Sequence, residues 1–476
     1  MFSGDALLRL SRWTFVFKQK RVEDIALYHS LNVDVIFLEK KFKKMINLLR
    51  FGITLNFLIQ KHYISEKKKV VQMVSELFKK GFIVRCDTDD FVLLDEKRKE
   101  YVRPVGLETL YLMLTDQCNL RCSYCFINNN MPSDYERRNM KWDVAKKAID
   151  VYFANLARNP AIFSKSVKTI FFYGGEPLLN FGMIKKCAEY INSSYKKEVN
   201  KMGNKFRLSL ITNGTLLDDK IVKFLADHKN ISVGISLDGN KKTNDQKRKH
   251  QSGTGSFDDV VRGFDLLKKA GCKNISLSCT VDDHNIDELS TLLDLGDKYG
   301  FVAINMNIVL DTEKEMVGGK YMKKVSKKLL DYFILARDRG AYEDRVMRKL
   351  KAFVSSKIHA FDCQATGNQI VCSPDGQIGL CHEGVGAKNF FFSGVNDELN
   401  FHDIPLVREW NERSPLNMPQ CFNCPAIGLC GGGCAYGAWL RSGSIWAMDN
   451  RFCAHSLVTL EWLIWDLYKQ ILKSSP

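Results

Sequence analysis

The sequence predicts an α/β protein built around a parallel sheet or partial (β/α)6 barrel. Beyond residue 109, short apolar segments suited to buried strands alternate with amphipathic segments suited to helices. Repetition of such pairs is typical of a parallel sheet covered by helices. The expected strands are 109–114, 168–172, 207–212, 231–237, 274–281 and 301–308. Helices are expected between them, for example at 142–157, 218–228 and 257–270.

A smaller unit precedes this core, and we expect residues 1–104 to form a winged-helix-like domain. Two apolar runs surround Asn32, as in a β-hairpin, and helices and a strand pair follow. The expected order is hairpin, two helices and the two strands of the wing, at 25–38, 42–64, 67–80, 81–85 and 90–94. The charged run 95–103, ending at Pro104, is the expected linker.

The regions that follow the core, which we place at residues 105–311, have different patterns. Residues 312–360 are basic and have helical periodicity, so we expect a helical bridge. Over residues 361–476 regular periodicity fades while Cys and Gly become frequent, which is typical of an irregular domain organised by metal centres. A final amphipathic helix is expected at 457–472.

Composition excludes several classes of protein. The 476 residues are 45% hydrophobic and 26% charged, as in a globular chain and unlike a disordered one. The sequence has no run of 18 apolar residues, which argues against a membrane span. The first 21 residues lack a signal-peptide pattern, so we expect a cytoplasmic protein.

The net charge of +16 is concentrated at the N-terminus. The first 104 residues contain 21 Lys and Arg and 13 Asp and Glu, which gives them +8. Nucleic acid or an acidic peptide could be the partner of such a unit. Solvated helix faces are the simpler explanation for a run such as Lys67-Lys68-Lys69.

Three of the 15 cysteines, Cys118, Cys122 and Cys125, follow the first expected strand with the spacing C-x3-C-x2-C. Disulfides are rare in the reduced cytoplasm, so metal binding is the better explanation for cysteines clustered in this way. Three thiolates can hold one iron–sulfur cluster but are one ligand short of the usual four, which leaves one iron open. The alternative is a structural zinc site with a distant fourth ligand.

A second motif, Gly174-Gly175-Glu176, follows the second expected strand. The two glycines allow a ligand to approach the backbone closely, and Glu176 supplies a carboxylate for an ammonium group. Active groups of parallel βα folds lie at the carboxyl ends of the strands, where both motifs are expected. Taken alone, the motif also fits a tight strand-to-helix turn.

With these two motifs the sequence resembles the radical S-adenosylmethionine enzymes. Cys118, Cys122 and Cys125 match the cluster motif of that family, and Gly174, Gly175 and Glu176 match its methionine-binding motif. The resemblance implies a [4Fe–4S] cluster whose open iron chelates S-adenosylmethionine. Reductive cleavage would give a 5′-deoxyadenosyl radical, which abstracts a substrate hydrogen.

The resemblance implies further cofactor contacts. Tyr124 occupies the place that lies by the adenine, and Arg248 the place that meets the cofactor carboxylate, whereas Asn244 replaces the usual histidine. The ends of the third and fourth strands add Asn213, Ser236 and Asp238. For Asn213, Asp238 and Arg248, turn formation or a surface ion pair is an alternative.

The remaining cysteines resemble the SPASM extension of radical enzymes that modify peptides. The residues that fit its pattern are Cys363, Gly376, Cys381, Cys421, Cys424, Cys430, Cys434 and Cys453. A zinc ribbon would explain only Cys421 and Cys424.

That resemblance implies two auxiliary [4Fe–4S] clusters, and so three clusters in all. Their expected ligands are Cys421, Cys424, Cys430 and Cys453 for one, and Cys363, Cys381 and Cys434 for the other. Cys372 departs from the pattern by its position. It is either the fourth ligand of the second set, or that cluster keeps an open iron.

The N-terminal unit resembles the leader-recognition domains fused to peptide maturases, which add a leader segment as a strand to a sheet edge. The expected partners are therefore a precursor peptide with a leader and a one-electron donor such as a flavodoxin or ferredoxin. Neither a membrane nor nucleic acid is expected as a partner.

The expected function is that of a radical peptide maturase, an oxidoreductase that forms a thioether or another crosslink. The alternatives are a peptide epimerase and an anaerobic sulfatase-type maturase, which forms formylglycine. In the latter enzymes an aspartate base follows the cysteine equivalent to Cys381, where this chain has His382 and then Glu383. The non-enzymatic alternative is a redox sensor that binds nucleic acid. No catalytic residue is assigned from the sequence.

Overall fold

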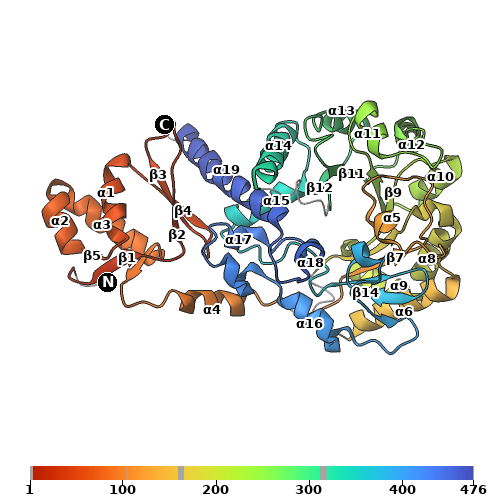
Figure 1. Cartoon of the computed structure of the whole chain (residues 1–476), viewed down its shortest axis with the longest axis horizontal. Helices are drawn as coiled ribbons and strands as arrows, with labels where there is room; N and C mark the ends of the chain where they lie inside the picture. The colour runs from red at the N-terminus through yellow and green to blue at the C-terminus, as the bar shows by residue number, and fades with distance from the viewer. Residues whose placement is uncertain (1–3, 104, 159–165, 311–318, 475–476) are drawn as a thin grey trace.

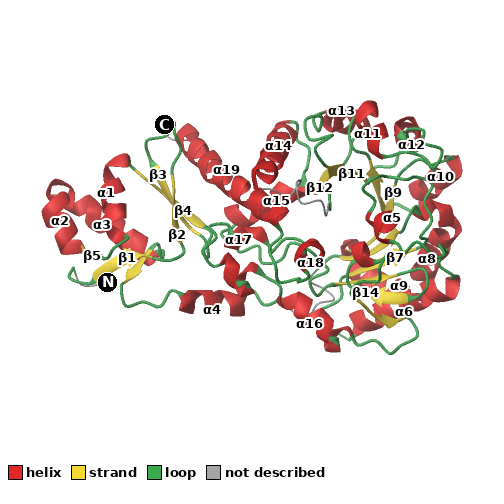
Figure 2. Ribbon diagram, in the orientation of Figure 1, coloured by secondary structure: helices red, strands yellow, loops and turns green. Residues whose placement is uncertain are grey.

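The computed structural model describes residues 4–103, 105–158, 166–310 and 319–474. The molecule is elongated, with the N-terminal domain at one end, the large sheet at the other and the C-terminal helix α19 (Asn450–Ser474) near the middle (Figure 1). Helices surround the strands of the large sheet on its outer side (Figure 2).

The core sheet contains the six strands that the sequence predicts. They are β7 (Thr109–Met113), β8 (Lys168–Tyr173), β9 (Phe206–Thr212), β10 (Ile231–Ser236), β11 (Ile275–Val281) and β12 (Ala303–Ile308). Each pairs in parallel with its sequence neighbour, so the prediction of a parallel α/β core is confirmed. The sheet is open, because β12 stands at its end and pairs only with β11 in the described part of the chain.

Three further strands extend the sheet beyond β7. Strand β13 (Gln369–Cys372) pairs in parallel with β7, and β14 (Gln377–Gly379) and β15 (Phe391–Gly394) follow it antiparallel. Segments far apart in the sequence therefore share one sheet, and β7 lies between β8 and β13.

Alternation along the strands separates the two faces of the sheet. In β8, Ile170 and Phe172 are fully buried on the side covered by helices, whereas Phe171 and Tyr173 on the other side are only partly buried. The covering helices include α6 (Trp142–Ala157), α8 (Phe181–Ser194), α10 (Asp219–Asp227), α12 (Phe257–Lys269) and α13 (Thr291–Tyr299). The face opposite these helices is the one on which a ligand can be bound.

In residues 4–103, the N-terminal domain has two three-stranded sheets and four α-helices. The first sheet has the order β2-β3-β4, with β2 (Thr14–Phe17), β3 (Ile25–His29) and β4 (Asp34–Leu38), so the expected hairpin at 25–38 is confirmed. The segment 42–64, expected as one helix, is divided into α1 (Lys43–Leu49) and α2 (Leu55–His62) by the short strand β5 (Ile53–Thr54). Helix α3 (Lys67–Lys79) follows as expected.

The wing differs from the prediction in its partner strand. Strand β6 (Ile83–Arg85) pairs with β1 (Leu7–Leu10), which also pairs with β5. The segment 90–94, expected as the second wing strand, begins helix α4 (Phe91–Glu100).

Helix α4 also replaces much of the expected linker at 95–103, and Asp90 explains why. The Asp90 carboxylate accepts hydrogen bonds from the Arg9 guanidinium at 2.6 Å and the Ser11 hydroxyl at 2.9 Å, which anchors the start of the helix. Within the helix, Lys97–Glu100 and Arg98–Asp95 form i,i+3 ion pairs, so the charged run favours a helix. Pro104, the expected end of the linker, lies outside the described residues.

The bridge and the C-terminal region connect the two ends of the molecule. The expected bridge contains α14 (Gly319–Asp338) and α15 (Asp344–Val354), although its first residues lie outside the described ranges. Helix α19 is longer than the expected 457–472. None of the described helices is long and apolar enough to cross a membrane.

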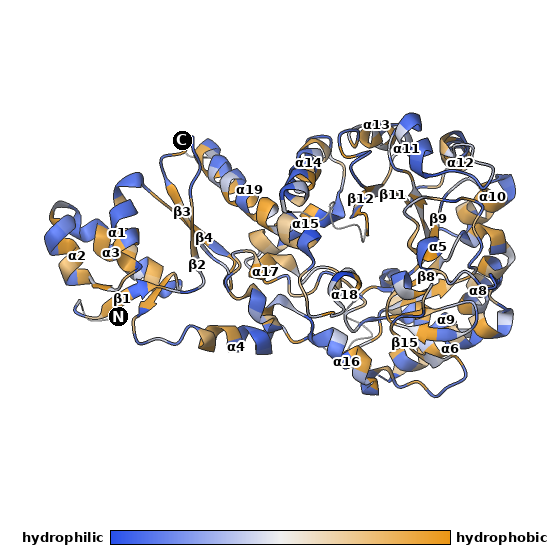
Figure 3. Ribbon diagram, viewed as in Figure 1, coloured by the Kyte–Doolittle hydropathy of each residue, from blue (hydrophilic) through white to orange (hydrophobic). Residues whose placement is uncertain are grey.

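One face of the sheet β2-β3-β4 packs on the C-terminal region. Tyr28 of β3 lies in one core with Phe353 of α15, Leu429 of α17 (Ile427–Cys430) and Leu460 of α19. Figure 3 shows hydrophobic residues on α17 and α19 where they lie beside this sheet. The approach is close at Gly428, where a Cβ atom would lie 2.3 Å from the carbonyl oxygen of Ser30.

We predict that Gly428→Ala weakens this packing by about 1–3 kcal/mol, because backbone must move to admit the methyl group. Urea unfolding would measure the loss. Gly182→Ala is the control, since a methyl group at this position in α8 would have no atom within 4 Å and the change suits a helix. A Gly428→Ala protein as stable as the wild type would contradict this account of the interface.

Candidate functional site

The three cysteines after β7 lie together at the carboxyl end of the sheet. Burial raises the pKa of Cys118, and the nearby sulfurs of Cys122 and Cys125 raise it further. The Leu120 N–H donates to the Cys118 sulfur at 3.4 Å, and the Arg248 guanidinium donates to the Cys122 sulfur at 3.5 Å. The loop thus gathers three sulfurs beside a buried cation.

The double-glycine motif is fixed to the backbone of this loop. The Gly175 N–H donates to the Thr115 carbonyl and the Glu176 N–H donates to the Gln117 carbonyl, both at 2.8 Å. A Cβ atom on Gly174 would lie 2.4 Å from the Thr115 oxygen, and one on Gly175 would lie 2.1 Å from the Gln117 oxygen. Glycine is therefore required at both positions for the two motifs to meet.

The Glu176 side chain ties the motif to the end of β9. Its carboxylate accepts hydrogen bonds from the Thr212 hydroxyl at 2.6 Å, the Asn213 N–H at 2.7 Å and the Leu178 N–H at 3.0 Å. The group is fully buried, and burial raises the pKa of Glu176 to about 7 in spite of these donors. The Asn213 side chain is directed toward the loop, 2.9 Å from Asn119 and 3.9 Å from the Cys118 sulfur.

Tyr124, Asp238 and Arg248 form one buried polar group near the third cysteine. The Tyr124 hydroxyl donates to Asp238, and the Arg248 guanidinium lies 3.4 Å from the same carboxylate. Asp238 and Arg248 are almost fully buried, and burial raises the pKa of Asp238 although Arg248 opposes this rise. Ser236 lies nearby along the chain as the last residue of β10, in register with Ser278 of β11.

The C-terminal cysteines form two groups. Burial raises the pKa of Cys453, and the sulfurs of Cys430, Cys421 and Cys424 raise it further, so these four lie together. Burial also raises the pKa of Cys381, with contributions from Glu383 and then from Cys434 and Cys363. The structure therefore brings together the same two sets that the sequence pattern implies.

Cys372 lies apart from both groups. It ends β13, opposite Leu112 of β7, and its thiol is directed to the Ser373 carbonyl at 3.6 Å. Burial raises its pKa, and the only other contributors are Asp375 and Lys388 within the described ranges. Successive side chains of β13 point to opposite faces of the sheet. Val371 therefore lies on the inner face with Met113 and Ile127, whereas Cys372 lies on the face covered by helices.

Buried cations beside the cysteines fit negatively charged iron–sulfur clusters. Lys349 is fully buried near Cys430, and its ammonium group has no hydrogen-bond partner among the residues that the structure describes. Asp362 supplies one anionic neighbour to this ammonium group, and a cluster held by four thiolates, including Cys430, would add further counter-charge. Arg413 fixes the loop before Cys434, donating to the carbonyls of Gly432 at 2.6 Å and Gly433 at 3.3 Å.

The structure reveals an aromatic surface between the first and second cysteine groups. His382 follows Cys381 and stacks on Tyr111 of β7, with ring centroids 4.6 Å apart. Tyr173 of β8 and Phe126, which follows Cys125, contact the same imidazole edge-on, at centroid distances of 5.3 and 5.8 Å. The sequence singles out His382 only through its position after Cys381, and the two tyrosines have no signal in the sequence.

Two groups on this surface have unused hydrogen-bonding capacity. His382 Nδ1 and one carboxylate oxygen of Glu383 are buried without a hydrogen-bond partner in the described part of the structure. Burial lowers the pKa of His382 to about 4 and raises the pKa of Glu383. The imidazole is therefore neutral near pH 7.

Comparisons with known proteins agree with this geometry. Residues 112–296 match the family model described as the Radical SAM superfamily. The chain is 24% identical over 485 residues to the radical SAM cyclopropyl synthase TigE of Paramaledivibacter caminithermalis, covering 98% of this chain and 95% of that protein. It is 26% identical over 337 residues to a cysteine-type anaerobic sulfatase-maturating enzyme of Clostridium perfringens. This match covers 67% of this chain and 85% of that protein.

Solved structures show the same fold. The structure of anSMEcpe with bound AdoMet has a TM-score of 0.62 at 22% identity, and the match covers 78% of this chain and 96% of that chain. Streptococcus suis SuiB bound to precursor peptide SuiA has a TM-score of 0.51 at 17% identity, and the match covers 95% of this chain and 99% of that chain. The chain thus contains a radical SAM domain and is a radical SAM enzyme.

We predict that Cys372→Ala leaves the iron content of the reconstituted protein unchanged, because this thiol lies away from the other sulfurs. Cys363→Ala should lower it, by up to about four irons per chain if the cluster is lost. Iron analysis of anaerobically reconstituted protein is the measurement. Equal losses in the two variants would show that Cys372 is a ligand.

Proposed function

We propose that this radical SAM enzyme modifies a ribosomally made precursor peptide, joining two of its atoms in a thioether or another crosslink. The observation that carries the proposal is the partly buried aromatic surface at His382, which lies between two cysteine groups on the inner face of the sheet. The full-length similarity to a cyclopropyl synthase supports bond formation and adds ring closure between carbons to the possible products.

We assign three [4Fe–4S] clusters to the three cysteine groups. The first is held by Cys118, Cys122 and Cys125, the second by Cys363, Cys381 and Cys434, and the third by Cys421, Cys424, Cys430 and Cys453. In this proposal Cys372 is a buried core thiol, and the second cluster keeps an iron without a cysteine ligand. Thiol chemistry of this kind suits the reducing cytoplasm, where we expect the enzyme to work.

We assign the S-adenosylmethionine site to the residues around the first cysteine group. Gly174 and Gly175 leave room along the backbone, Glu176 attracts the ammonium group, and Arg248 attracts the carboxylate. The remaining residues that we assign to the wall of this site are Tyr124, Asn213, Ser236 and Asp238. When bound, the cluster and S-adenosylmethionine supply the one-electron chemistry that removes a hydrogen atom from the substrate.

The chain's own residues orient the peptide and take up a proton. Tyr111, Tyr173 and Phe126 surround the His382 ring and exclude water from it. Crosslinking by this route removes two hydrogen atoms, one as the abstracted atom and one as a proton with an electron. Glu383 can take the proton, because burial raises the pKa of its carboxyl group. When bound, the auxiliary clusters would supply an acceptor for the electron, which a flavodoxin or ferredoxin would remove.

We assign leader binding to the groove between β4 and α3. Strand β4 is at the edge of the sheet β2-β3-β4, and no other described strand pairs with its outer side. The groove measures about 290 Å³ and combines apolar Ile36, Phe42 and Met73 with charged Lys69 and Glu76. An extended peptide can pair with such an edge while its side chains enter the groove.

We predict that co-expression with the peptide encoded beside the gene yields a product lighter by two hydrogen atoms per crosslink, and that reduced enzyme releases 5′-deoxyadenosine. Mass spectrometry measures the mass of the peptide, and chromatography measures the 5′-deoxyadenosine that is released. An unchanged peptide mass would indicate epimerisation, and a product that reacts with hydroxylamine would indicate formylglycine. Absence of 5′-deoxyadenosine would contradict the whole proposal.

Two variants serve as controls for this experiment. Cys118→Ala should abolish both readouts, because the first cluster loses a ligand. Met73→Asp should retain peptide-independent formation of 5′-deoxyadenosine but lose peptide modification, because a charge in the groove opposes burial of the leader. Full modification by the Met73→Asp enzyme would show that the leader binds elsewhere.

We predict that S-adenosylmethionine binds more weakly as the pH falls from 8 to 6. The pKa of Glu176 is raised to about 7, so its carboxyl group takes up a proton in this range and loses its attraction for the ammonium group. The affinity should fall by at most about tenfold per pH unit below 7. Equilibrium dialysis with anaerobic enzyme would measure it.

Glu176→Gln should bind weakly at pH 8 and show a flatter pH profile. The same slope in wild type and variant would mean that another group titrates. A wild-type affinity that is constant between pH 6 and 8 would exclude the proposed role of Glu176.

A further inference from the structure

Tyr28 buries a hydroxyl group for which the described residues offer no hydrogen-bond partner. The residue is fully buried in β3, the central strand of the N-terminal sheet. Leaving such a group unpaired costs about 1–3 kcal/mol, which a phenylalanine at the same place would avoid. An acceptor from outside the protein would therefore stabilise this part of the structure.

The surroundings of Tyr28 lead to the third cysteine group. Its ring lies between Phe17 and Phe353, at centroid distances of 6.3 and 6.2 Å, and shares a core with Cys421 and Cys424. Burial raises the pKa of Tyr28, and the Cys424 sulfur raises it further, which shows that phenol and thiol are neighbours.

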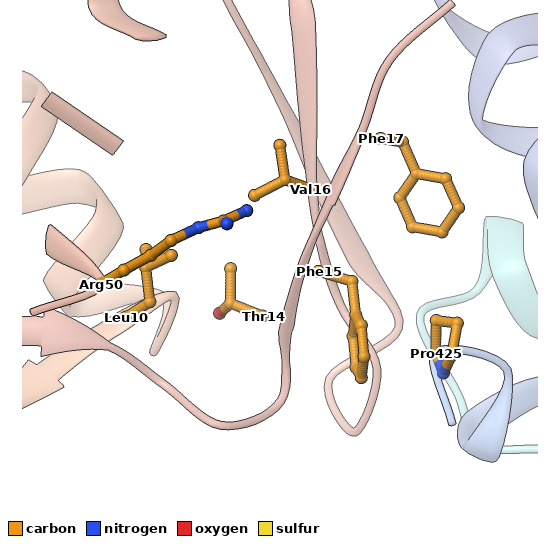
Figure 4. Close-up of a pocket in the computed structure, with 7 residues that line it drawn as sticks. All are labelled: Leu10, Thr14, Phe15, Val16, Phe17, Arg50 and Pro425. Carbon is orange, nitrogen blue, oxygen red and sulfur yellow. The ribbon is translucent and has the colours of Figure 1, made fainter. Parts of the chain in front are cut away.

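The loop that carries Cys424 is held against the N-terminal domain on several sides. The Arg12 guanidinium donates to the Asn423 side chain at 2.7 Å, and the backbone at Gly428 packs against Ser30. Figure 4 shows Phe15 and Phe17 of β2 beside Pro425, the residue after Cys424, at a cleft of about 510 Å³. These contacts fix the distance between β3 and the cysteines.

We propose that the Tyr28 hydroxyl donates a hydrogen bond to a sulfur of the cluster held by Cys421, Cys424, Cys430 and Cys453, and so raises the reduction potential of that cluster. The inference rests on the proposed third cluster. Reduction adds negative charge to the sulfurs, and a hydrogen-bond donor stabilises the reduced form more than the oxidised form. Tyr28 is thus a positioning and tuning residue contributed by a different domain.

The test compares the midpoint potential of this cluster in the full-length, reconstituted wild type and in Tyr28→Phe, by redox titration followed by EPR. The signal that disappears in Cys453→Ala identifies the cluster. We expect a lower midpoint potential in Tyr28→Phe at unchanged iron content. Tyr332→Phe is the matched control, because Tyr332 on α14 also buries a hydroxyl without a hydrogen-bond partner in the described ranges, and its pKa is affected by Cys279 and not by a cluster cysteine.

A second substitution at position 28 distinguishes the loss of a hydrogen bond from a loss of packing. Incorporation of 3-fluorotyrosine at position 28 makes the phenol a stronger donor and should shift the potential upward, opposite to Tyr28→Phe. An unchanged potential in Tyr28→Phe at full iron content, an equal shift in Tyr332→Phe, or shifts of the same sign for both replacements at position 28 would overturn the inference. Unchanged iron in Cys453→Ala would instead contradict the cluster on which it rests.

Discussion

The site depends on hydrogen bonds that continue the β7–β8 pairing past the ends of both strands. The Leu114 N–H donates to the Tyr173 carbonyl, and the next bonds run from Gly175 to Thr115 and from Glu176 to Gln117, all at 2.8 Å. Strand pairing therefore passes directly into the contact between the cysteine loop and the double-glycine turn. Side chains larger than hydrogen at Gly174 or Gly175 would break this continuity, since their Cβ atoms would overlap carbonyl oxygens. The position of Glu176 relative to the three sulfurs follows from the backbone, before any side chain is considered.

The other side of β7 provides the second half of the site by the same principle. Strand β13 pairs with β7 in register, Cys372 opposite Leu112, and the turn through β14 brings Cys381 and His382 to the same face as Tyr111. Parallel pairing on both sides of one strand thus brings together residues that are more than 250 positions apart in the sequence. The cations beside the cysteines, such as Lys349 near Cys430, place positive charge where the sulfurs gather.

Much of this arrangement could be predicted from local sequence. The six strands have clear apolar periodicity, and the close spacing of Cys118, Cys122 and Cys125 identifies the first cysteine group. The division of the later cysteines into two sets came from the resemblance to the SPASM extension and not from spacing, since Cys434 is only four residues after Cys430 but belongs to the other set. Features that depend on contacts between residues far apart in the sequence were less predictable. The segment 90–94 has the composition of a strand, yet it begins a helix. Its first residue, Asp90, is anchored by Arg9 and Ser11, which are about 80 residues away from it in the sequence. The separation of Cys372 from the cysteine groups depends on which face of β13 its side chain takes, and that is fixed only by pairing with β7. The ring stack of His382 on Tyr111 likewise has no local signal.

The close fit of β3 against the loop of Cys421 to Cys430 bears on how this protein can be dissected. Removing the N-terminal domain would take away Tyr28 and Ser30 and expose the apolar surface around Leu429 and Leu460. Solvent and oxygen would then reach sulfurs that the intact chain covers. A truncated enzyme that fails to act on a peptide would therefore say little about peptide recognition, because the same cut would uncover the cysteines to which we assign a cluster. For the same reason, exchange of this domain between related enzymes would have to preserve the surface that meets the cysteine loop, which restricts how freely recognition and catalysis can be recombined.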